Sequence, residues 1–268
     1  MRYSTPTSII QFFRYLLFFW GIVTIAGCAS SDEKDHSEGW SAQQLYNEAK
    51  SERIAGNYET ALEYYQKLES RYPFGRYAQQ AQIETIYVYY KSDEPAQAIA
   101  SAERFIKLYP RHDHIDYVYY LKGITNFNLG KGFFDRYLPL DPAQRDPGSA
   151  LKAFQDFGEL IKHFPNSKYA EDARQRMLYL RNNLAKHEVY VADYYLRRGA
   201  YVAAANRGKY VVENYQGAPS IADALLVMIE AYKLMGLDQL SLEALRVLQL
   251  NFPEHPEVAV VKKMGADK

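Results

Sequence analysis

The chain has 268 residues and one cysteine, Cys28, whose sequence context points to lipid attachment. Cys28 follows the small residues Ala26-Gly27 at the end of an apolar run that begins at Tyr15, directly after Arg14. A basic segment, a short apolar segment and small residues at a cut site form the layout of a secretion signal. A cysteine thiolate placed there is a nucleophile that can accept a diacylglycerol group. We therefore predict a lipoprotein signal peptide at residues 1–27, and N-palmitoyl and S-diacylglycerol groups on Cys28.

The alternative for this segment is a membrane-spanning anchor. The apolar run from Tyr15 to Gly27 has 13 residues, whereas a spanning helix needs about 20. Polar residues follow Cys28 closely, and Ala29 and Ser30 provide no aspartate that would retain the protein in the inner membrane. The pattern favours a lipoprotein on the periplasmic face of the outer membrane, with residues 28–40 as the lipidated cysteine and a flexible polar tether.

The sequence contains no recognisable catalytic constellation. Gly130-Lys131-Gly132 lacks the spacing and the Ser/Thr of a phosphate-binding loop, and Val191 stands where a zinc-protease helix beginning at His187-Glu188 would need its second histidine. Lys and Arg number 32 and Asp and Glu number 32, so the formal net charge is zero and no basic surplus favours nucleic acid. We expect no enzymatic activity, no cofactor, no bound metal and no nucleic-acid partner.

Aromatic and basic side chains indicate binding instead of catalysis. Arg71, Tyr72 and Phe74 lie in one turn, and Tyr87 and Tyr90 lie in the helical segment that follows. Tyrosine and arginine are the residues that most often anchor interfaces. An aromatic, partly basic groove suits an extended peptide with an aromatic side chain and a free carboxylate. The alternative, that most of these rings are core residues, stays open at this point.

The elements that must position these side chains are predicted to be helix pairs. In five segments a turn residue, a small residue and apolar residues at helical spacing precede an aromatic residue that ends the segment. Proline follows four of these aromatics, where it stops a helix because it lacks an N–H and disfavours helical geometry before it. The five ending residues are Tyr72, Tyr109, Phe164, Tyr215 and Phe252. The pattern predicts an all-α, tetratricopeptide-like superhelical solenoid of five helix pairs.

The repeat frame also predicts the organisation of the chain. The five repeats are expected at about 41–75, 76–112, 113–167, 168–217 and 218–254, followed by a tail at 255–268. Two of them are long. The third contains an insertion, Lys131–Pro147, which is either part of a binding face or a passive loop that covers a repeat junction. In the fourth, the first helix is expected to run from about Tyr169 to Leu196 without a break.

Several segments of the chain resemble the lipoprotein component of the outer-membrane β-barrel assembly machinery, the family of BamD or ComL type. The resemblance covers nearly all of the mature chain. The segments that carry it are Arg71–Gly75, Ile86–Lys91, Ile115–Tyr120, Arg145–Pro147, Pro165–Tyr169, Leu184–Lys186, Tyr194-Tyr195 and Arg198–Ala200.

This resemblance implies a function and partners. It implies that C-terminal repeats dock on the periplasmic domains of the barrel-forming insertase (BamA type) and that N-terminal repeats receive the C-terminal signals of unfolded outer-membrane proteins. Other lipoproteins of the assembly complex are implied as further partners. By its motif, the Asn206-Arg207 pair matches the family's insertase-contacting arginine, and Tyr201 is expected at the same contact. Gly208 follows Arg207 where a bulkier residue is common in the family, which puts the local helix in doubt.

Two other classes of function remain as alternatives. One is a periplasmic repeat lipoprotein that acts as an adaptor for peptidoglycan or envelope organisation. The other is an enzyme with its site in the Lys131–Pro147 insertion, which the missing catalytic constellation disfavours.

Overall fold

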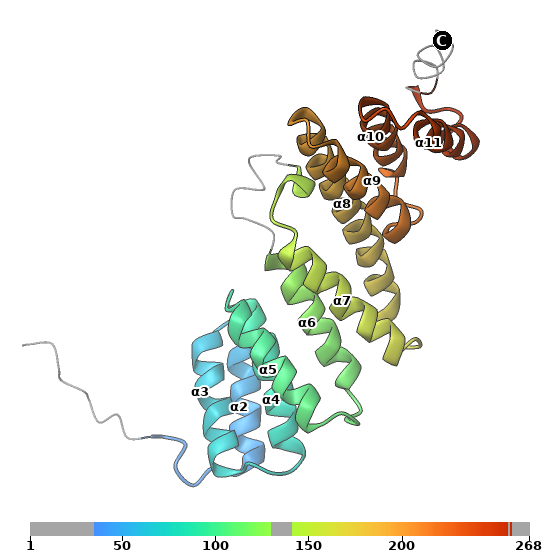
Figure 1. The fold of residues 1–268 in the computed structure, drawn as a ribbon. Coiled ribbons are helices and arrows are strands. Elements are labelled where there is room, and N and C mark those ends of the chain that lie inside the picture. The colour runs from blue at the N-terminus through green and yellow to red at the C-terminus, as the bar shows by residue number, and fades with distance from the viewer. Residues whose placement is uncertain (1–34, 130–140, 257, 259–268) are drawn as a thin grey trace, which may run out of the picture. The chain divides into compact units, whose positions relative to one another are not determined.

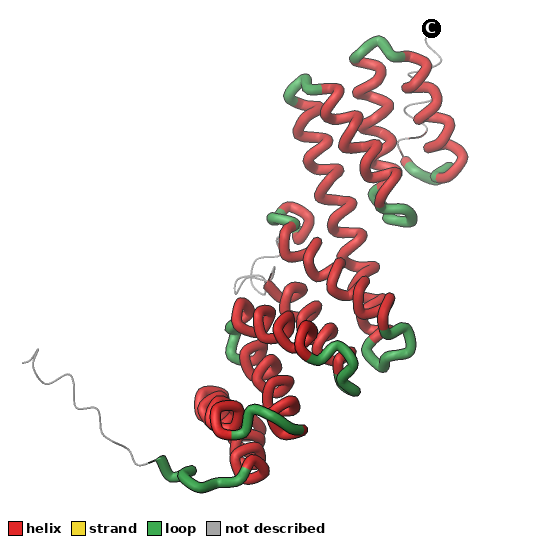
Figure 2. Tube along the Cα trace, turned by 60° about the horizontal axis from the view of Figure 1, so that its bottom comes forward, coloured by secondary structure: helices red, strands yellow, loops and turns green. Residues whose placement is uncertain are grey.

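The computed structural model describes residues 35–129, 141–256 and 258. Over these residues the regular structure consists of ten α-helices and one short 3₁₀ helix, with no strand (Figures 1 and 2). The α-helices are α2 (Ala42–Ala55), α3 (Tyr58–Arg71), α4 (Arg76–Lys91), α5 (Pro95–Leu108), α6 (Ile115–Leu129), α7 (Gly148–His163), α8 (Ala170–Arg197), α9 (Tyr201–Asn214), α10 (Ile221–Leu234) and α11 (Asp238–Asn251); the 3₁₀ helix is η2 (Pro142–Gln144). The predicted tetratricopeptide-like solenoid of five helix pairs is confirmed.

The ends of the second helices have one common structure. In each pair the predicted aromatic residue caps the helix with a non-helical backbone, φ between −120° and −134° and ψ between 46° and 67°, and its backbone N–H still donates to the carbonyl four residues earlier. Those carbonyls belong to the buried residues Leu68, Phe105, Leu160, Val211 and Leu248. The chain thus leaves each helix directly beside a core side chain, and in four of the five pairs the proline that follows prevents another helical turn.

Small side chains let the two helices of each pair approach closely. The small residue in the first half of every second helix is at most 8% exposed, and these residues are Ala61, Ala98, Ala153, Ala204 and Ser241. In four pairs the turn between the helices contains a residue with positive φ: Gly56, Asp93, Gly199 and Gly236. The third pair differs because its helices are joined through the insertion and not by a tight turn.

Helix packing follows the order of the chain within the unit Ser41–Lys268. Each helix packs on the next in the sequence, with η2 and α8 also in contact, and the first helices of neighbouring pairs meet at α2–α4, α4–α6 and α8–α10. Such contacts place first helices on the inner side of a solenoid, the side on which repeat proteins bind ligands. The inner surface is therefore formed chiefly by α2, α4, α6, α8 and α10.

Four predicted segments lie wholly or mostly outside the described residues. The signal peptide at 1–27 and Cys28 are not described, and of the tether only residues 35–40 are, as a turn. Of the Lys131–Pro147 insertion, residues 141–147 are described, and of the C-terminal tail only residues 255, 256 and 258. No helix among the described residues is both long enough and apolar enough to cross a bilayer.

Candidate functional site

The loop between α3 and α4 presents an exposed aromatic tip. Arg71 is the last residue of α3, Tyr72 caps the helix with 37% of its surface exposed, and Phe74 is 90% exposed. Gly75 closes the tip at φ 101° and ψ 177°, a backbone region that is essentially restricted to glycine. The tip therefore holds Phe74 in solvent through a backbone conformation that other residues do not readily adopt.

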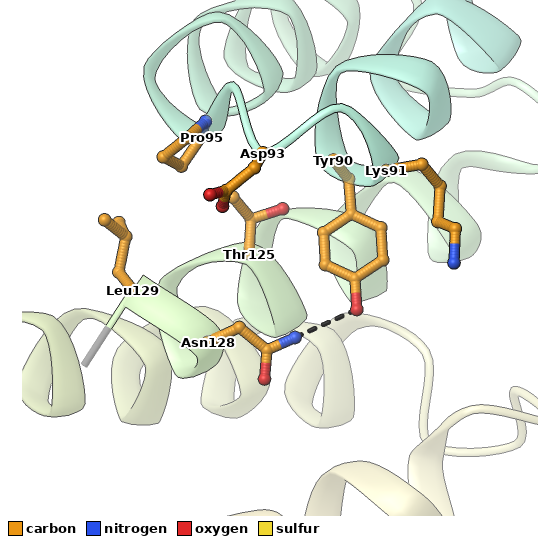
Figure 3. Close-up of a pocket in the computed structure, with 7 residues that line it drawn as sticks. All are labelled: Tyr90, Lys91, Asp93, Pro95, Thr125, Asn128 and Leu129. Carbon is orange, nitrogen blue, oxygen red and sulfur yellow. Dashed lines mark hydrogen bonds between the residues drawn. The ribbon is translucent and has the colours of Figure 1, made fainter. Parts of the chain in front are cut away.

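A pocket of about 500 Å³ lies at the opposite end of α4 (Figure 3). Tyr90 and Lys91 from α4, and Thr125 and Asn128 from α6, form its walls with Asp93 from the α4–α5 turn. Further lining comes from Pro95 and Leu129. The Asn128 side-chain amide donates a 2.9 Å hydrogen bond to the Tyr90 hydroxyl. This bond joins the first helices of the second and third repeats across the pocket.

The pocket offers several hydrogen-bonding groups to a ligand. A tyrosine hydroxyl that accepts a hydrogen bond retains its own hydrogen for donation, and an asparagine that donates through its amide retains its carbonyl oxygen as an acceptor. Tyr90 and Asn128 are in these two states. The Lys91 ammonium and the Asp93 carboxylate add one charge of each sign. These groups can hydrogen-bond a ligand that carries both donors and acceptors.

Tyr87 has a different environment from Tyr90. It is half-buried against the cluster of Ile83, Phe105 and Leu121, and the Arg53 guanidinium lies 5.3 Å from its ring centroid. Arg53 also pairs with Glu84 at 3.0 Å. Part of the Tyr87 ring therefore packs against α4, α5 and α6, and Arg53 of α2 lies beside it.

The inner face of α4 also carries residues that the sequence analysis did not single out, namely Tyr77, Gln80 and Glu84. Together with Tyr87 they recur at spacings of three and four residues and so share one face of the helix. The ring of Tyr46, on α2, lies 5.6 Å from that of Tyr77. Burial, together with the nearby Glu84 carboxylate, raises the pKa of Tyr46 to about 12, which keeps this phenol neutral. The spacing of this stripe was a signal in the sequence that could have identified it.

The structure separates the predicted groove residues into two groups. Gly75 and Tyr90 are fifteen residues apart along a helix that rises 1.5 Å per residue, so the tip and the pocket are about 22 Å apart. Tyr72 and Phe74 therefore do not share a pocket with Tyr90. An extended peptide of about seven residues, at about 3.3 Å per residue, spans the same distance along α4.

The residues expected to contact an insertase lie on α9 and point in two directions. Arg207 and Asn206 are exposed, whereas Tyr201, the first residue of the helix, packs half-buried against the cluster around Ala192 and Ala204. Arg207 Nη1 lies 2.8 Å from the Glu188 Oε2 on α8. The Glu188 side chain is only 15% exposed and that of Arg207 is 45% exposed. The guanidinium is thus held at the α8–α9 surface with part of its donor face towards solvent.

Gly208 preserves α9 instead of interrupting it. Helix α9 continues from Tyr201 to Asn214 through Gly208, which is buried at the contact with α10. A Cβ atom at this position would lie 2.7 Å from Met228 Cγ and 2.8 Å from the carbonyl oxygen of Ala224. The doubt about the local helix was wrong, because the missing side chain is what allows the two helices to pack closely.

The described residues contain no cluster of three or more His, Cys, Asp or Glu side chains that could hold a metal ion. His112 and His114 lie with their rings 5.7 Å apart in the α5–α6 turn, and His112 Nδ1 accepts a hydrogen bond from the backbone N–H of His114. Burial is the main cause that lowers the pKa of His112. The pair therefore serves the turn itself in this structure.

Comparison with known proteins gives one consistent result. Residues 39–248 match the model of the YfiO family, described as an outer membrane lipoprotein. The chain is 41% identical over 238 residues to the outer membrane protein assembly factor BamD of Neisseria gonorrhoeae, covering 87% of this chain and 89% of that protein. It is 39% identical over 251 residues to the BamD of Vibrio cholerae, covering 94% of this chain and 99% of that protein.

Solved structures give a weaker likeness. The TPR-like repeats of a putative kinesin light chain from Podosopora anserina match with 13% identity and a TM-score of 0.35, over 80% of this chain and 96% of that chain. A score of this size supports no argument about function.

Proposed function

The chain belongs to the YfiO family of outer membrane lipoproteins, and on this premise we propose that it is a lipid-anchored assembly factor for outer-membrane β-barrel proteins. The observation that carries the proposal is the match over 87% to 94% of the chain to relatives named as outer membrane protein assembly factors. A solenoid with an aromatic inner face provides the extended surface that a binding subunit needs.

Depletion of the chain from cells tests this function directly. A subunit of the assembly machinery is needed to insert porins, so porin levels in the outer membrane should fall on depletion. An adaptor for peptidoglycan or envelope organisation would instead alter cell shape or wall content and leave porins at their normal level. Unchanged porins after depletion would therefore contradict the proposal.

We further propose that the α8–α9 surface docks on the periplasmic domains of the barrel-forming insertase, with Arg207 as the central contact. The guanidinium is half exposed and is oriented by Glu188, which lies mostly buried beneath it. An arginine held in this way can form a charge-assisted hydrogen bond to a partner carboxylate with little loss of side-chain entropy. Asn206, next to it and also exposed, adds a neutral donor and acceptor.

Co-purification with a matched control tests the docking surface. Arg207→Glu should abolish co-purification of the insertase with this chain while the helical circular dichroism stays unchanged. Arg197→Glu is the control, because Arg197 is also an exposed arginine in an ion pair, at 3.0 Å from Asp193 on α8. Equal retention of the insertase by the two variants would refute a specific role for Arg207.

We also propose that the N-terminal repeats bind the C-terminal signals of unfolded barrel proteins along α4. The terminal carboxylate would be held at the Tyr90 pocket, and the preceding residues would extend along the inner face past Tyr87 towards Tyr72 and Phe74, with Arg71 beside them. The 22 Å length of this path fits a segment of about seven extended residues. The charged and polar groups of the pocket suit the chain terminus, and the exposed rings at the tip suit aromatic side chains.

Photocrosslinking from Tyr90 and Phe74 tests this path. An eight-residue peptide that ends in an aromatic residue should crosslink to both positions. Amidation of its terminal carboxylate should reduce the crosslink at Tyr90 more than the crosslink at Phe74. Tyr194, an exposed aromatic on α8, is the control position. Equal crosslinking at Tyr194, or crosslinking that does not depend on the terminal residue, would contradict the proposal.

The anchoring of the chain follows from Cys28, which lies outside the described residues. We propose that lipid on this residue holds the solenoid at the periplasmic face of the outer membrane. Cys28→Ala should leave an uncut precursor in the inner membrane, seen as a larger band after membrane fractionation. Normal processing of this variant would refute the lipid attachment.

A further inference from the structure

The end of the insertion in the third repeat is fastened to the middle of α8. Asp141 Oδ2 accepts a 2.6 Å hydrogen bond from the Tyr190 hydroxyl and lies 2.7 Å from the Lys186 Nζ. Two residues further along the chain, the carbonyl oxygen of Ala143 accepts a 2.8 Å hydrogen bond from His187 Nδ1. Three side chains of one α8 segment therefore hold two groups of the insertion, the Asp141 carboxylate and the Ala143 carbonyl.

The fastened segment also has a capping hydrogen bond of its own and a buried residue. Asp141 caps η2 by accepting a 3.0 Å hydrogen bond from the Ala143 N–H, and Ala143 is only 1% exposed. Hydrogen bonds from Lys186 and Tyr190 lower the pKa of Asp141 to about 2, so this carboxylate is charged at every physiological pH. We refer to these contacts as the clasp, which we define as Asp141 and Ala143 with Lys186, His187 and Tyr190 on α8.

The clasp occupies the part of α8 that α7 leaves uncovered. Helix α8 has 28 residues and α7 has 16, so at 1.5 Å per residue α8 is about 18 Å longer. Because η2 precedes α7 in the chain and packs on α8, it contacts the part of α8 that extends past the first residue of α7. The other side of this segment faces α9, through Val189 in the cluster with Val211 and Tyr215.

The same turn of α8 orients Arg207. Glu188, which pairs with Arg207 at 2.8 Å, lies between the clasp residues His187 and Tyr190 in the sequence. At 100° per residue, Glu188 faces away from Lys186 and Tyr190, so α8 is held by η2 on one side and carries the Arg207 partner on the other. A rotation or shift of this turn would move the Glu188 carboxylate and with it the guanidinium.

We propose that Asp141 is a positioning residue for the insertase contact: by clasping the Lys186–Tyr190 turn of α8 it sets the place of Glu188, and through it the orientation of Arg207. This inference rests on the proposed docking role of Arg207. It assigns the described end of the insertion a function in partner binding without contact to the partner. The insertion is then more than a passive cover over a repeat junction.

A double-mutant cycle on the full lipidated chain in detergent tests the coupling. Affinity for the purified insertase is measured for the parent, Asp141→Ala, Arg207→Ala and the double variant. Asp141→Ala should weaken insertase binding about fivefold in a chain that retains Arg207. It should have little further effect on binding in a chain that carries Arg207→Ala. Losses that multiply in the double variant would overturn the proposal, because independent sites act additively in free energy.

Companion variants separate positioning from a loss of folding. Tyr190→Phe removes a single hydrogen bond at nearly constant volume and should weaken binding about twofold. Exchange of the charges, Asp141→Lys with Lys186→Asp, should recover part of the affinity. Asp193→Ala removes an exposed ion pair elsewhere on α8 and should have no effect. A role for the clasp would be contradicted if the charge exchange recovered no affinity and Tyr190→Phe bound the insertase as tightly as the parent.

Hydrogen exchange decides the inference independently of the insertase. Asp141→Ala should speed amide exchange in residues 186–190 and 205–209 and leave α2–α5 unchanged. Faster exchange confined to residues 141–147 would show that the clasp does not reach α9 and would overturn the proposal. If exchange rises in both segments but Arg207→Ala binds the insertase normally, the coupling stands and the proposed docking role of Arg207 fails.

Discussion

At Gly208, helix propensity and packing predict opposite effects of one added methyl group on the stability of the chain. Alanine is favoured over glycine in a helix interior by about 1 kcal/mol. At Gly208, however, the new Cβ would lie 2.8 Å from a backbone oxygen of α10 and 2.7 Å from Met228 Cγ. Overpacking of this kind costs about 1–3 kcal/mol. The net expectation for Gly208→Ala is a loss of up to about 2 kcal/mol in the free energy of unfolding.

Gly158 supplies the matched control on α7. It also lies inside a helix, but a Cβ there meets only Met177 Cε at 3.7 Å, an ordinary contact. Gly158→Ala should therefore stabilise the chain by about 1 kcal/mol. A difference of about 2 kcal/mol between the variants corresponds to roughly 4–8 °C in melting temperature for a chain of this size.

Thermal unfolding of the two variants, followed by circular dichroism at 222 nm, gives the answer. Gly158→Ala should melt above the parent and Gly208→Ala below Gly158→Ala. Because Gly208 adjoins Arg207, Gly208→Ala should also weaken insertase binding. An increase in melting temperature of equal size for both variants would refute the reasoning, since it would mean that α9 and α10 are not in close contact at Gly208.

Three further perturbations follow from the structure. The folded-state pKa of Asp141, about 2, lies below its ordinary value of 3.8, so the stability that Asp141 contributes is complete above about pH 4 and is lost as the pH falls through 2. In acid unfolding, the difference in stability between the parent and Asp141→Asn should therefore shrink from pH 4 to pH 2. A constant difference would contradict the lowered pKa of Asp141. Gly75→Ala should destabilise the chain by about 1–3 kcal/mol in urea unfolding, because alanine is strained in the backbone conformation of Gly75, although no atom lies within 4 Å of the added Cβ. An unchanged urea midpoint would show that the loop between α3 and α4 adopts another backbone conformation without cost. Lys122→Ala should lower the free energy of unfolding by about 2 kcal/mol in the same assay, because the Lys122 ammonium lies 3.0 Å from the Glu103 carboxylate and 3.2 Å from that of the largely buried Asp156. An unchanged stability would mean that the hydrogen bond from Asn126 is enough to stabilise the Asp156 carboxylate.

Local sequence signals were sufficient for the helices and their ends. The aromatic residue at the end of each second helix, the small residues such as Ala61 and Ala204, and the long α8 were all predictable, because helical periodicity and the effect of proline act within four residues of the chain. The one local error concerned Gly208. Its value as a packing site depends on α10, which begins thirteen residues later.

The candidate sites were only partly predictable. Tyr90 was chosen from the sequence, but its partner Asn128 is 38 residues away and became visible only when α4 and α6 were seen to be neighbours. Phe74 and Tyr90 were expected in one groove, yet the length of α4 holds them about 22 Å apart. Arg207 could be selected only through the family resemblance, because its partner Glu188 lies on another helix.

Residues close together in the chain were enough to predict five helix pairs, the end of each second helix and a secretion-type segment before Cys28. These properties depend on residues within one or two helical turns of each other. The contacts of Asp141 with Lys186 and Tyr190, and of Glu188 with Arg207, became visible only in the folded chain. Those contacts join residues 19 to 49 positions apart, and they depend on how far α8 extends beyond α7 and on how closely its neighbours pack. No local pattern encodes these quantities.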